Sequence, residues 1–274
     1  MIPEPDISLS GSELKAYIER FSKNRILIIG DIILDKYVWG HVSRISPEAP
    51  VPVVEVKQET KRLGGAANVL NNIASLGGHA VLCGVVGDDR AGREIVERVR
   101  SMGLPADGII TVSDRPTSVK SRVVAHNQQV VRFDLEDRRT ISEEEIGGIL
   151  SFVEQVRDQV DAVIVADYGK GVISEVMMRG LRSLAWDSDT IIGVDPKTGN
   201  FDYYRGVHVL TPNHHEAGAY SGIAIQDEES LLEAGRRMLE GLEARSVLIT
   251  QGKDGMTLFE HGGEVIHIPT VARK

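Results

Sequence analysis

The chain has 274 residues, which is enough for one large domain with a substantial core. Apolar residues make up 42% and charged residues 26%, as in ordinary globular proteins, and the formal net charge is −9. An acidic chain without a Lys/Arg run argues against nucleic acid or an anionic membrane as its main partner. The single cysteine, Cys83, excludes an internal disulfide framework and argues against a cysteine-based zinc cluster.

The N-terminal region lacks the pattern of a targeting segment. Glu4 and Asp6 occur early, and no apolar stretch follows that is long enough for a signal peptide. No window of the sequence is long and apolar enough to span a bilayer. We therefore expect a cytoplasmic protein.

Apolar strands alternate with amphipathic helices along most of the chain. Ser10 and Glu13 have capping-box spacing and predict a first helix over about 12–21. Strands are then expected at 25–30, 80–86, 161–166, 191–194, 207–210 and 246–250, and helices after residue 65 and at 91–102, 142–156, 174–185, 213–220 and 228–242. This alternation predicts an α/β fold with a doubly wound, mainly parallel sheet and helices on both faces.

Two stretches, 37–56 and 118–135, break this rhythm. The second alternates polar and apolar residues around a polar turn at 126–128, which is typical of an antiparallel hairpin. We expect these stretches to form a small antiparallel sheet beside the main domain. Such a lid excludes water from reactive chemistry, so it favours an enzyme.

Asp31 directly follows the strand at 25–30, and Asp35 lies four residues later. Ligands of open parallel sheets bind beyond the carboxyl ends of the strands. A carboxylate there can accept hydrogen bonds from the vicinal hydroxyls of a sugar. A cap or turn residue is an equally good interpretation of Asp31 taken alone.

Gly64 and Gly65 open a helix that carries Asn68 in its first turns. This start leaves backbone N–H groups uncovered and lets a ligand approach closely, and the Asn68 amide can contact the same hydroxyls. The alternative is a glycine turn that leads into a helix packed closely on the sheet.

Lys197, Asn213 and Glu216 follow two later strands. An amide and a carboxylate three residues apart suit a hydrated Mg²⁺ and the phosphates it carries, and Lys197 can balance the charge of a transferring phosphoryl group. Asn213 and Glu216 also fit a simple capping box. Thr250 and Gly252 follow another strand, where the glycine turn either admits a nucleotide or only begins a hairpin of 256–259 with 265–268.

The sequence lacks G-x-x-x-x-G-K-[ST], G-x-G-x-x-G, G-x-S-x-G and H-E-x-x-H motifs. Their absence argues against the enzyme classes that these motifs mark, such as the dinucleotide-dependent oxidoreductases. His214 and His215 are neighbours and are expected to point apart, so a shared metal site there is not expected.

Taken in order, these motifs resemble those of the ribokinase-like (PfkB) carbohydrate kinases, which transfer the γ-phosphate of ATP to a sugar hydroxyl. The resemblance runs from about 26 to 270. The segments 30–35, 43–52, 127–129 and 166–171 look most like the bacterial heptose 7-phosphate kinases. This resemblance implies phosphorylation of heptose 7-phosphate at the C1 hydroxyl, on the route to ADP-heptose and lipopolysaccharide.

The resemblance also implies roles for individual residues. The sugar would be held by Asp31, Gly64, Gly65, Asn68 and more weakly Asp35, and the ATP and Mg²⁺ by Lys197, Asn213, Glu216 (through water), Thr250 and Gly252. The lid would close over the sugar and pair two subunits. From chemistry alone, Arg44, Arg122 and Arg132 are candidates for the substrate's existing phosphate, because arginine forks match phosphate oxygens.

One family signature, D-T-x-G-A-G-D, does not occur in these 274 residues. Its last Asp is the catalytic base, so no catalytic residue is assigned, and the base is expected beyond Lys274. We therefore expect 1–274 to be an incomplete kinase domain with impaired turnover. A kinase of another sugar or a nucleoside, and a non-catalytic sugar-phosphate-binding module, are the alternative functions.

Overall fold

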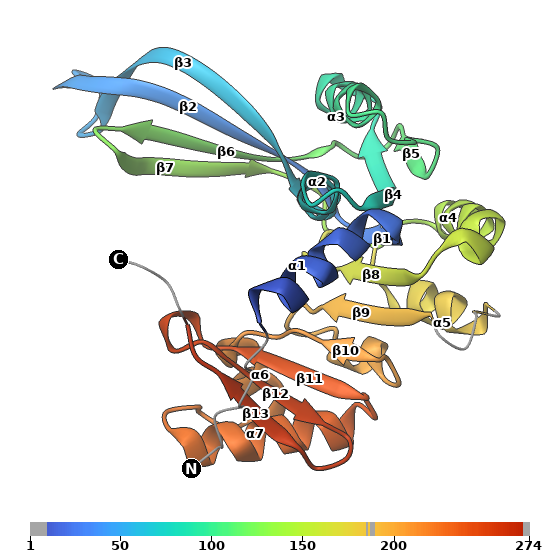
Figure 1. The fold of residues 1–274 in the computed structure, drawn as a ribbon. Coiled ribbons are helices and arrows are strands. Elements are labelled where there is room, and N and C mark those ends of the chain that lie inside the picture. The colour runs from blue at the N-terminus through green and yellow to red at the C-terminus, as the bar shows by residue number, and fades with distance from the viewer. Residues whose placement is uncertain (1–9, 185, 187–189, 271–274) are drawn as a thin grey trace.

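The computed structural model describes residues 10–184, 186 and 190–270. Glu4 and Asp6, the end of the helix expected to reach 185, and residues 271–274 lie outside this part of the chain. The described residues form a large sheet with helices packed against it and a long sheet that projects from one side (Figure 1).

The helices are α1 (Gly11–Arg20), α2 (Ala66–Ser75), α3 (Arg90–Ser101), α4 (Glu143–Val156), α5 (Glu175–Ser183), α6 (His214–Ser221) and α7 (Glu228–Gly241), with short 3-10 turns η1 (Phe21–Lys23), η2 (Arg157–Gln159), η3 (Phe201–Tyr204) and η4 (Gly252–Asp254). The strands of the large sheet are β1 (Arg25–Gly30), β4 (His79–Gly87), β5 (Ile109–Val112), β8 (Ala162–Ala166), β9 (Ile191–Asp195), β10 (Val209–Leu210), β11 (Ser246–Thr250), β12 (Met256–Glu260) and β13 (Val265–Ile268).

The large sheet has the order β13-β12-β11-β10-β9-β8-β1-β4-β5. Its strands from β11 through β5 pair in parallel, whereas β12 and β13 form an antiparallel hairpin at one edge. The predicted α/β fold with a mainly parallel sheet is therefore confirmed, including the hairpin expected at 256–268.

The core lies on both faces of this sheet, because its central strands are apolar throughout. In β1, Leu27 and Ile29 belong to a cluster that α4, α5 and α7 cover, while Ile28 belongs to a second cluster under α2 and α3. Among the described residues the second cluster reaches only from β5 to β8, so helices cover both faces over that part of the sheet.

Capping sets the starts of several helices as predicted. The hydroxyl of Ser10 and the carboxylate of Glu13 form the expected box at α1, and Ser142 with Glu145 does so at α4. None of the residues of α1 is buried, so its apolar stripe is exposed. No helix in the described residues is long and apolar enough to cross a bilayer.

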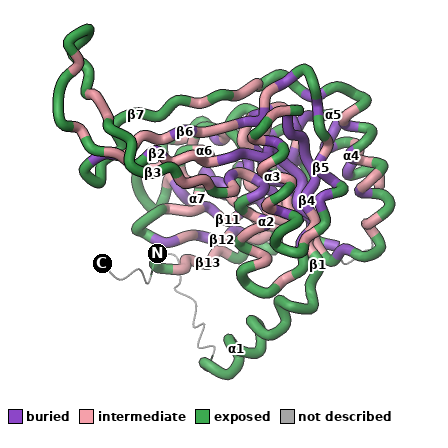
Figure 2. The backbone as a smooth tube through the Cα atoms, turned by 90° about the horizontal axis from the view of Figure 1, so that it is seen from above, coloured by how far each residue is buried: buried purple, intermediate pink, exposed green. Residues whose placement is uncertain are grey.

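The projecting sheet, called the lid below, has the order β3-β2-β6-β7. Its strands are β2 (Ile32–Ile45), β3 (Pro52–Gly65), β6 (Ser118–Ala125) and β7 (Gln128–Leu135). His126 and Asn127 have φ of 51° and 60°, the left-handed backbone of the predicted tight turn. Seen from above, the outer lid carries mostly exposed residues, in contrast to the buried centre of the main sheet (Figure 2).

The lid is longer than the expected boundary 37–56. Strand β2 begins at Ile32, with one residue between it and the end of β1, and β3 continues to Gly65, directly before α2. The apolar residues at 32–34 are buried and extend the first core strand in sequence, so their pattern alone does not mark the point where the chain passes from one sheet to the other.

Candidate active site

Polar residues follow a series of neighbouring parallel strands. In the order β1, β8, β9, β10 and β11, the residues at or within three positions beyond the strand ends include Asp31, Tyr168, Asp195, Asn213 and Thr250. Neighbouring strands lie about 4.8 Å apart, so this series spans about 19 Å of one sheet edge. The predicted placement of the motifs at one edge is therefore what the structure shows.

Asp31 is buried and holds the loop that follows β8. Its carboxylate accepts hydrogen bonds from the backbone N–H groups of Tyr168 (2.8 Å), Lys170 (3.0 Å) and Val172 (3.1 Å). Burial raises the pKa of Asp31, and these bonds act in the opposite direction. With 1% of its surface exposed, Asp31 positions the loop, and its direct contact with a sugar stays a prediction.

Asp35 lies on the lid, close to the start of α2. Its Oδ1 accepts a 2.5 Å hydrogen bond from Arg122, whose pKa is raised mainly by this bond. A Cβ on Gly64 would lie 2.5 Å from Asp35 Oδ2, so the carboxylate lies directly over the glycine backbone. Gly65 caps α2 with φ of 56°, and Asn68 is exposed in the first turn of that helix. Asp35, the weaker candidate in the sequence, is thus the partly open carboxylate of the two.

Asp195, at the end of β9, interacts with the hydroxyl of Tyr168. Burial and the nearby carboxylate of Glu216 raise the pKa of Asp195 to about 6. Burial and Asp195 raise the pKa of the Tyr168 hydroxyl to about 12, so this group stays protonated. Lys197 is exposed, and its side chain lies beside Gly169, the residue after Tyr168. Its positive charge lowers the pKa of Asp195 and so opposes the effect of burial.

Asn213 and Glu216 form a complete capping box at the start of α6. Asn213 Oδ1 accepts from the N–H groups of His215 (2.9 Å) and Glu216 (3.0 Å), and Glu216 Oε2 accepts from the Asn213 N–H (3.0 Å). The capping interpretation is therefore realised, and the Mg²⁺ role of Glu216 stays a prediction. Within residues 10–184, 186 and 190–270, no group of three or more His, Cys, Asp or Glu side chains is arranged as a metal site.

A magnesium ion nevertheless fits the donors at this edge. Asp195 and Glu216 offer carboxylate oxygens, the ligand type that Mg²⁺ prefers, and Mg²⁺ keeps several waters and needs few protein ligands. The raised pKa of Asp195 records repulsion between the two carboxylates. A divalent cation would relieve that repulsion.

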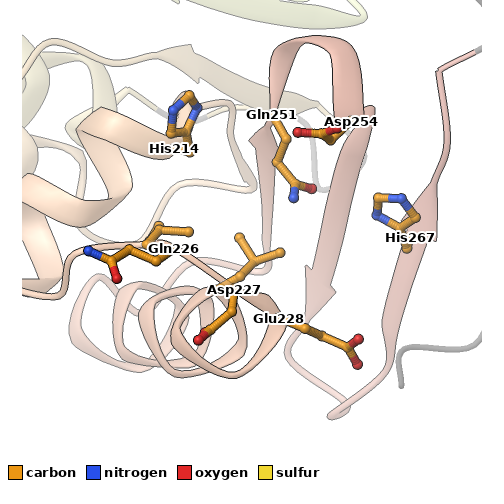
Figure 3. Close-up of a pocket in the computed structure, with 9 residues that line it drawn as sticks. His214, Gln226, Asp227, Glu228, Gln251, Asp254 and His267 are labelled. Carbon is orange, nitrogen blue, oxygen red and sulfur yellow. The ribbon is translucent and has the colours of Figure 1, made fainter.

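A pocket of about 440 Å³ lies between α6, α7 and the β11–β13 strands (Figure 3), and it is lined by Gln251, the residue between Thr250 and Gly252, but by neither of those two residues. Its lining includes His214, Gln251, Asp254 and His267. Asn213 and Thr250 form an isolated bridge, so the pocket adjoins the capping box. Contrary to the expectation that they point apart, the rings of His214 and His215 lie 3.9 Å from each other.

The three arginines predicted to bind a phosphate do not lie together. Arg122 and Arg132 are paired across β6 and β7 and share the lid face of Asp35. Arg44 lies nine residues beyond Asp35 on the extended strand β2, which is about 30 Å. Within one chain Arg44 therefore does not share their site, because the long strand carries it to the outer end of the lid.

Two residues of this region were missed in the sequence. The Lys120 ammonium lies 5.7 Å from the centre of the Tyr168 ring, at the junction of lid and sheet edge. The alternating pattern of 118–125 places Lys120 and Arg122 on one face, and Tyr168 lies two residues after a strand end. The sequence pattern alone therefore could have identified both residues as candidates for the site.

Comparison with known proteins gives the family. A model of the pfkB family of carbohydrate kinases matches residues 23–274. The chain belongs to this family. It is similar to the bifunctional protein HldE of Geobacter sulfurreducens (44% identity over 248 residues) and of Desulfatibacillum aliphaticivorans (42% over 257 residues). These matches cover 90% and 94% of the chain but only 51% and 53% of the two relatives, so the chain spans about half their length.

Solved structures of other pfkB-like proteins have the same fold. Phosphofructokinase-2 from Escherichia coli in complex with fructose-6-phosphate aligns with a TM-score of 0.73 and 16% identity, over 92% of this chain and 81% of that one. Arabidopsis thaliana ribokinase complexed with ribose and ATP aligns with a TM-score of 0.67 and 17% identity, over 90% and 78%. The ribokinase-like α/β fold of this family member is thus established.

Proposed function

We propose that the chain carries the sugar kinase site of a cytoplasmic enzyme that phosphorylates heptose 7-phosphate at the C1 hydroxyl with ATP, giving heptose 1,7-bisphosphate. One observation carries the proposal: the Asp35–Arg122 pair lies on the lid close to Tyr168, and the Tyr168–Asp195 pair and Glu216 follow along the adjoining edge of the main sheet. The similarity to relatives called HldE supports the heptose substrate, and the resemblance of 43–52 to heptose kinases agrees with it.

In this proposal the sugar binds at the lid end of the edge. The Asp35 carboxylate accepts hydrogen bonds from sugar hydroxyls, with Arg122 fixing its orientation, and the backbone around Gly64 and Gly65 lets the sugar approach α2. Asn68 contributes its amide. Asp31 acts indirectly, because it holds the 168–172 loop in place.

The nucleotide binds at the other end. Its nucleoside occupies the pocket beside Thr250 and Gly252 (Figure 3), and its phosphates extend toward Lys197 and the start of α6, where Asn213 fixes Glu216. Glu216, through water, and Asp195 would hold Mg²⁺, and the ion would supply positive charge that neutralises the phosphates. The positive end of α6 faces the same region and favours an anion there.

The transfer itself needs an in-line arrangement of the two substrates. The C1 oxygen attacks the γ-phosphorus, a new O–P bond forms, the bond from that phosphorus to the bridging oxygen of ADP breaks, and the hydroxyl proton passes to a base. The residues named here orient the two substrates and balance charge, and none of them is assigned as that base.

Calorimetric titration of the chain with heptose 7-phosphate, with and without Mg-ATP, tests this proposal. We expect saturable binding of heptose 7-phosphate and weaker binding of a nucleoside or an unphosphorylated hexose. Binding without appearance of the bisphosphate would support a sugar-phosphate-binding module for this chain. Absence of heptose 7-phosphate binding would remove the heptose assignment.

We also propose that the lid pairs two copies of the chain. Val131, Phe133 and Leu135 alternate along the edge strand β7 and are 49%, 56% and 56% exposed. They lie on the lid face opposite Asp35, so a partner that covers them leaves the sugar side accessible. Sedimentation of Phe133→Glu beside the unsubstituted chain tests this, and an unchanged molecular mass would contradict it.

A further inference from the structure

The lid face that carries Asp35 also gathers positive charge. One row across β3, β2, β6 and β7 contains Arg62, Asp35, Lys120 and Asp134. In the next row on the same face, Arg122 and Arg132 lie directly opposite each other. Four cations thus face the sheet edge from this side of the lid with two carboxylates between them.

Placing two arginines opposite each other is unfavourable unless an anion lies between or beside them. Arg122 is already paired with Asp35 at 2.5 Å, and its side chain is 21% exposed. The Arg132 Nε lies 3.2 Å from Asp134, but half of its side chain is open to solvent. The face as a whole therefore carries four cations against two carboxylates, and the half-exposed Arg132 side chain is accessible from solvent.

Lys120 differs from the other lysines of this region. Lys170 is paired with Glu136 at 2.6 Å, whereas Lys120 forms no ion pair with any residue that the structure describes. It is half-buried over the Tyr168 ring, and burial together with the charge of Lys170 lowers its pKa. Asp35 and Asp134 attract this ammonium from the neighbouring strands but form no ion pair with it, so the Lys120 ammonium at the mouth of the site can still bind an anion.

We infer that Lys120, with Arg132 beside it, binds the phosphate monoester that the sugar substrate already carries, and that Arg122 is a positioning residue for Asp35. This inference rests on the proposed function, because it names the part of the substrate that the same site selects. A compact ammonium acts as a point charge for the phosphate dianion, and the arginine fork adds directed hydrogen bonds. The phosphate then lies on the lid, away from the reacting hydroxyl.

Calorimetry on Lys120→Gln tests the role directly. We expect its affinity for heptose 7-phosphate to fall by about tenfold or more, and its affinity for unphosphorylated heptose to stay unchanged. Lys36→Gln is the matched control, because Lys36 lies on the opposite lid face, next in sequence to Asp35, and pairs with Glu59. An equal loss for both sugars, or unchanged heptose 7-phosphate binding in Lys120→Gln, would overturn the inference.

A second measurement does not depend on the identity of the sugar. The lysines of the unsubstituted chain are reductively methylated in rising concentrations of inorganic phosphate, and the products are mapped by mass spectrometry. We expect phosphate to protect Lys120 and not Lys36. If phosphate protects Lys120 but heptose 7-phosphate does not bind, the proposed function fails and the anion site stands. If heptose 7-phosphate binds and phosphate leaves Lys120 unprotected, the inference fails alone.

Discussion

Replacing Gly64 by alanine would place a methyl group against the carboxylate on which sugar binding is proposed to depend. The new Cβ would lie 2.5 Å from Asp35 Oδ2 and 3.0 Å from its Cγ, which is roughly 1 Å inside normal contact distances. The carboxylate must turn away, and its bond from Arg122 would be lost or realigned. A charge-assisted hydrogen bond is worth about 1.5–3 kcal/mol. We therefore expect the Kd for heptose 7-phosphate to rise by about 10- to 100-fold.

The assay is calorimetric titration with heptose 7-phosphate and, separately, with a non-hydrolysable ATP analogue in Mg²⁺. Nucleotide affinity should be unchanged, because the nucleotide residues follow β9, β10 and β11, on the far side of β8 from the lid. Gly147→Ala in α4 is the control, since its Cβ meets nothing within 4 Å and should only stabilise the helix, by about 0.5–1 kcal/mol. Unaltered sugar affinity in Gly64→Ala, or equal loss for both ligands, would refute the reasoning.

Three further changes have defined outcomes. Asp31→Ala leaves two buried N–H groups and one partly buried N–H group of the 168–172 loop without their acceptor, so urea denaturation should show a loss of about 3 kcal/mol in the free energy of unfolding. A loss below about 1 kcal/mol would contradict its structural role. Asp195 has a folded-state pKa of about 6 against an ordinary 3.8, so the folded chain binds the extra proton between these values, and its stability falls as pH rises through that window. In Asp195→Asn the free energy of unfolding should lose about 1–2 kcal/mol less over this pH range, after allowance for solvent screening. If the variant and the unsubstituted chain lose equal stability with pH in urea denaturation, the raised pKa is wrong. Glu216→Gln keeps an acceptor for the Asn213 N–H, so the thermal stability should be unchanged. The gain in ATP affinity that Mg²⁺ gives should fall about tenfold, and an unchanged gain would show that Glu216 does not help to hold the ion.

The sequence pattern predicts the sheet and its caps well because both depend on local chemistry. Strand 25–30 is apolar on both faces, and Ser10, Ser142 and Asn213 each have a partner three residues away that completes a box. The placement of polar residues at one edge follows from the parallel topology, without any knowledge of side-chain contacts.

Side-chain partners were not predictable in the same way. The sequence favours Asp31 over Asp35 as the sugar ligand, yet the Asp31 carboxylate is occupied by N–H groups from a loop 137 to 141 residues away, and Asp35 is partly open. The same limit applies to Arg44, which shares a residue type with Arg122 and Arg132 but lies at the far end of a strand. The shared face of Lys120 and Arg122 follows from alternation along one strand, but only the strand register shows that Asp35 and Arg132 lie on that face too.

The lid is continuous with the framework of the domain. Asp31 is the single residue between β1 and β2; its N–H bonds to the Ala166 carbonyl at 3.2 Å, and its own carbonyl accepts from the Ala66 N–H at 2.9 Å. Both ends of the β2–β3 ribbon are thus anchored within a few residues of where the sugar is proposed to lie. A lid attached through a flexible linker can be shortened or exchanged without changing the active site. Here, deletion of part of the β2–β3 ribbon would remove residues of the proposed sugar site itself. Substrate specificity in this fold is therefore better changed by substitutions along the ribbon that leave the two ends of the ribbon, near Asp31 and Gly65, unchanged.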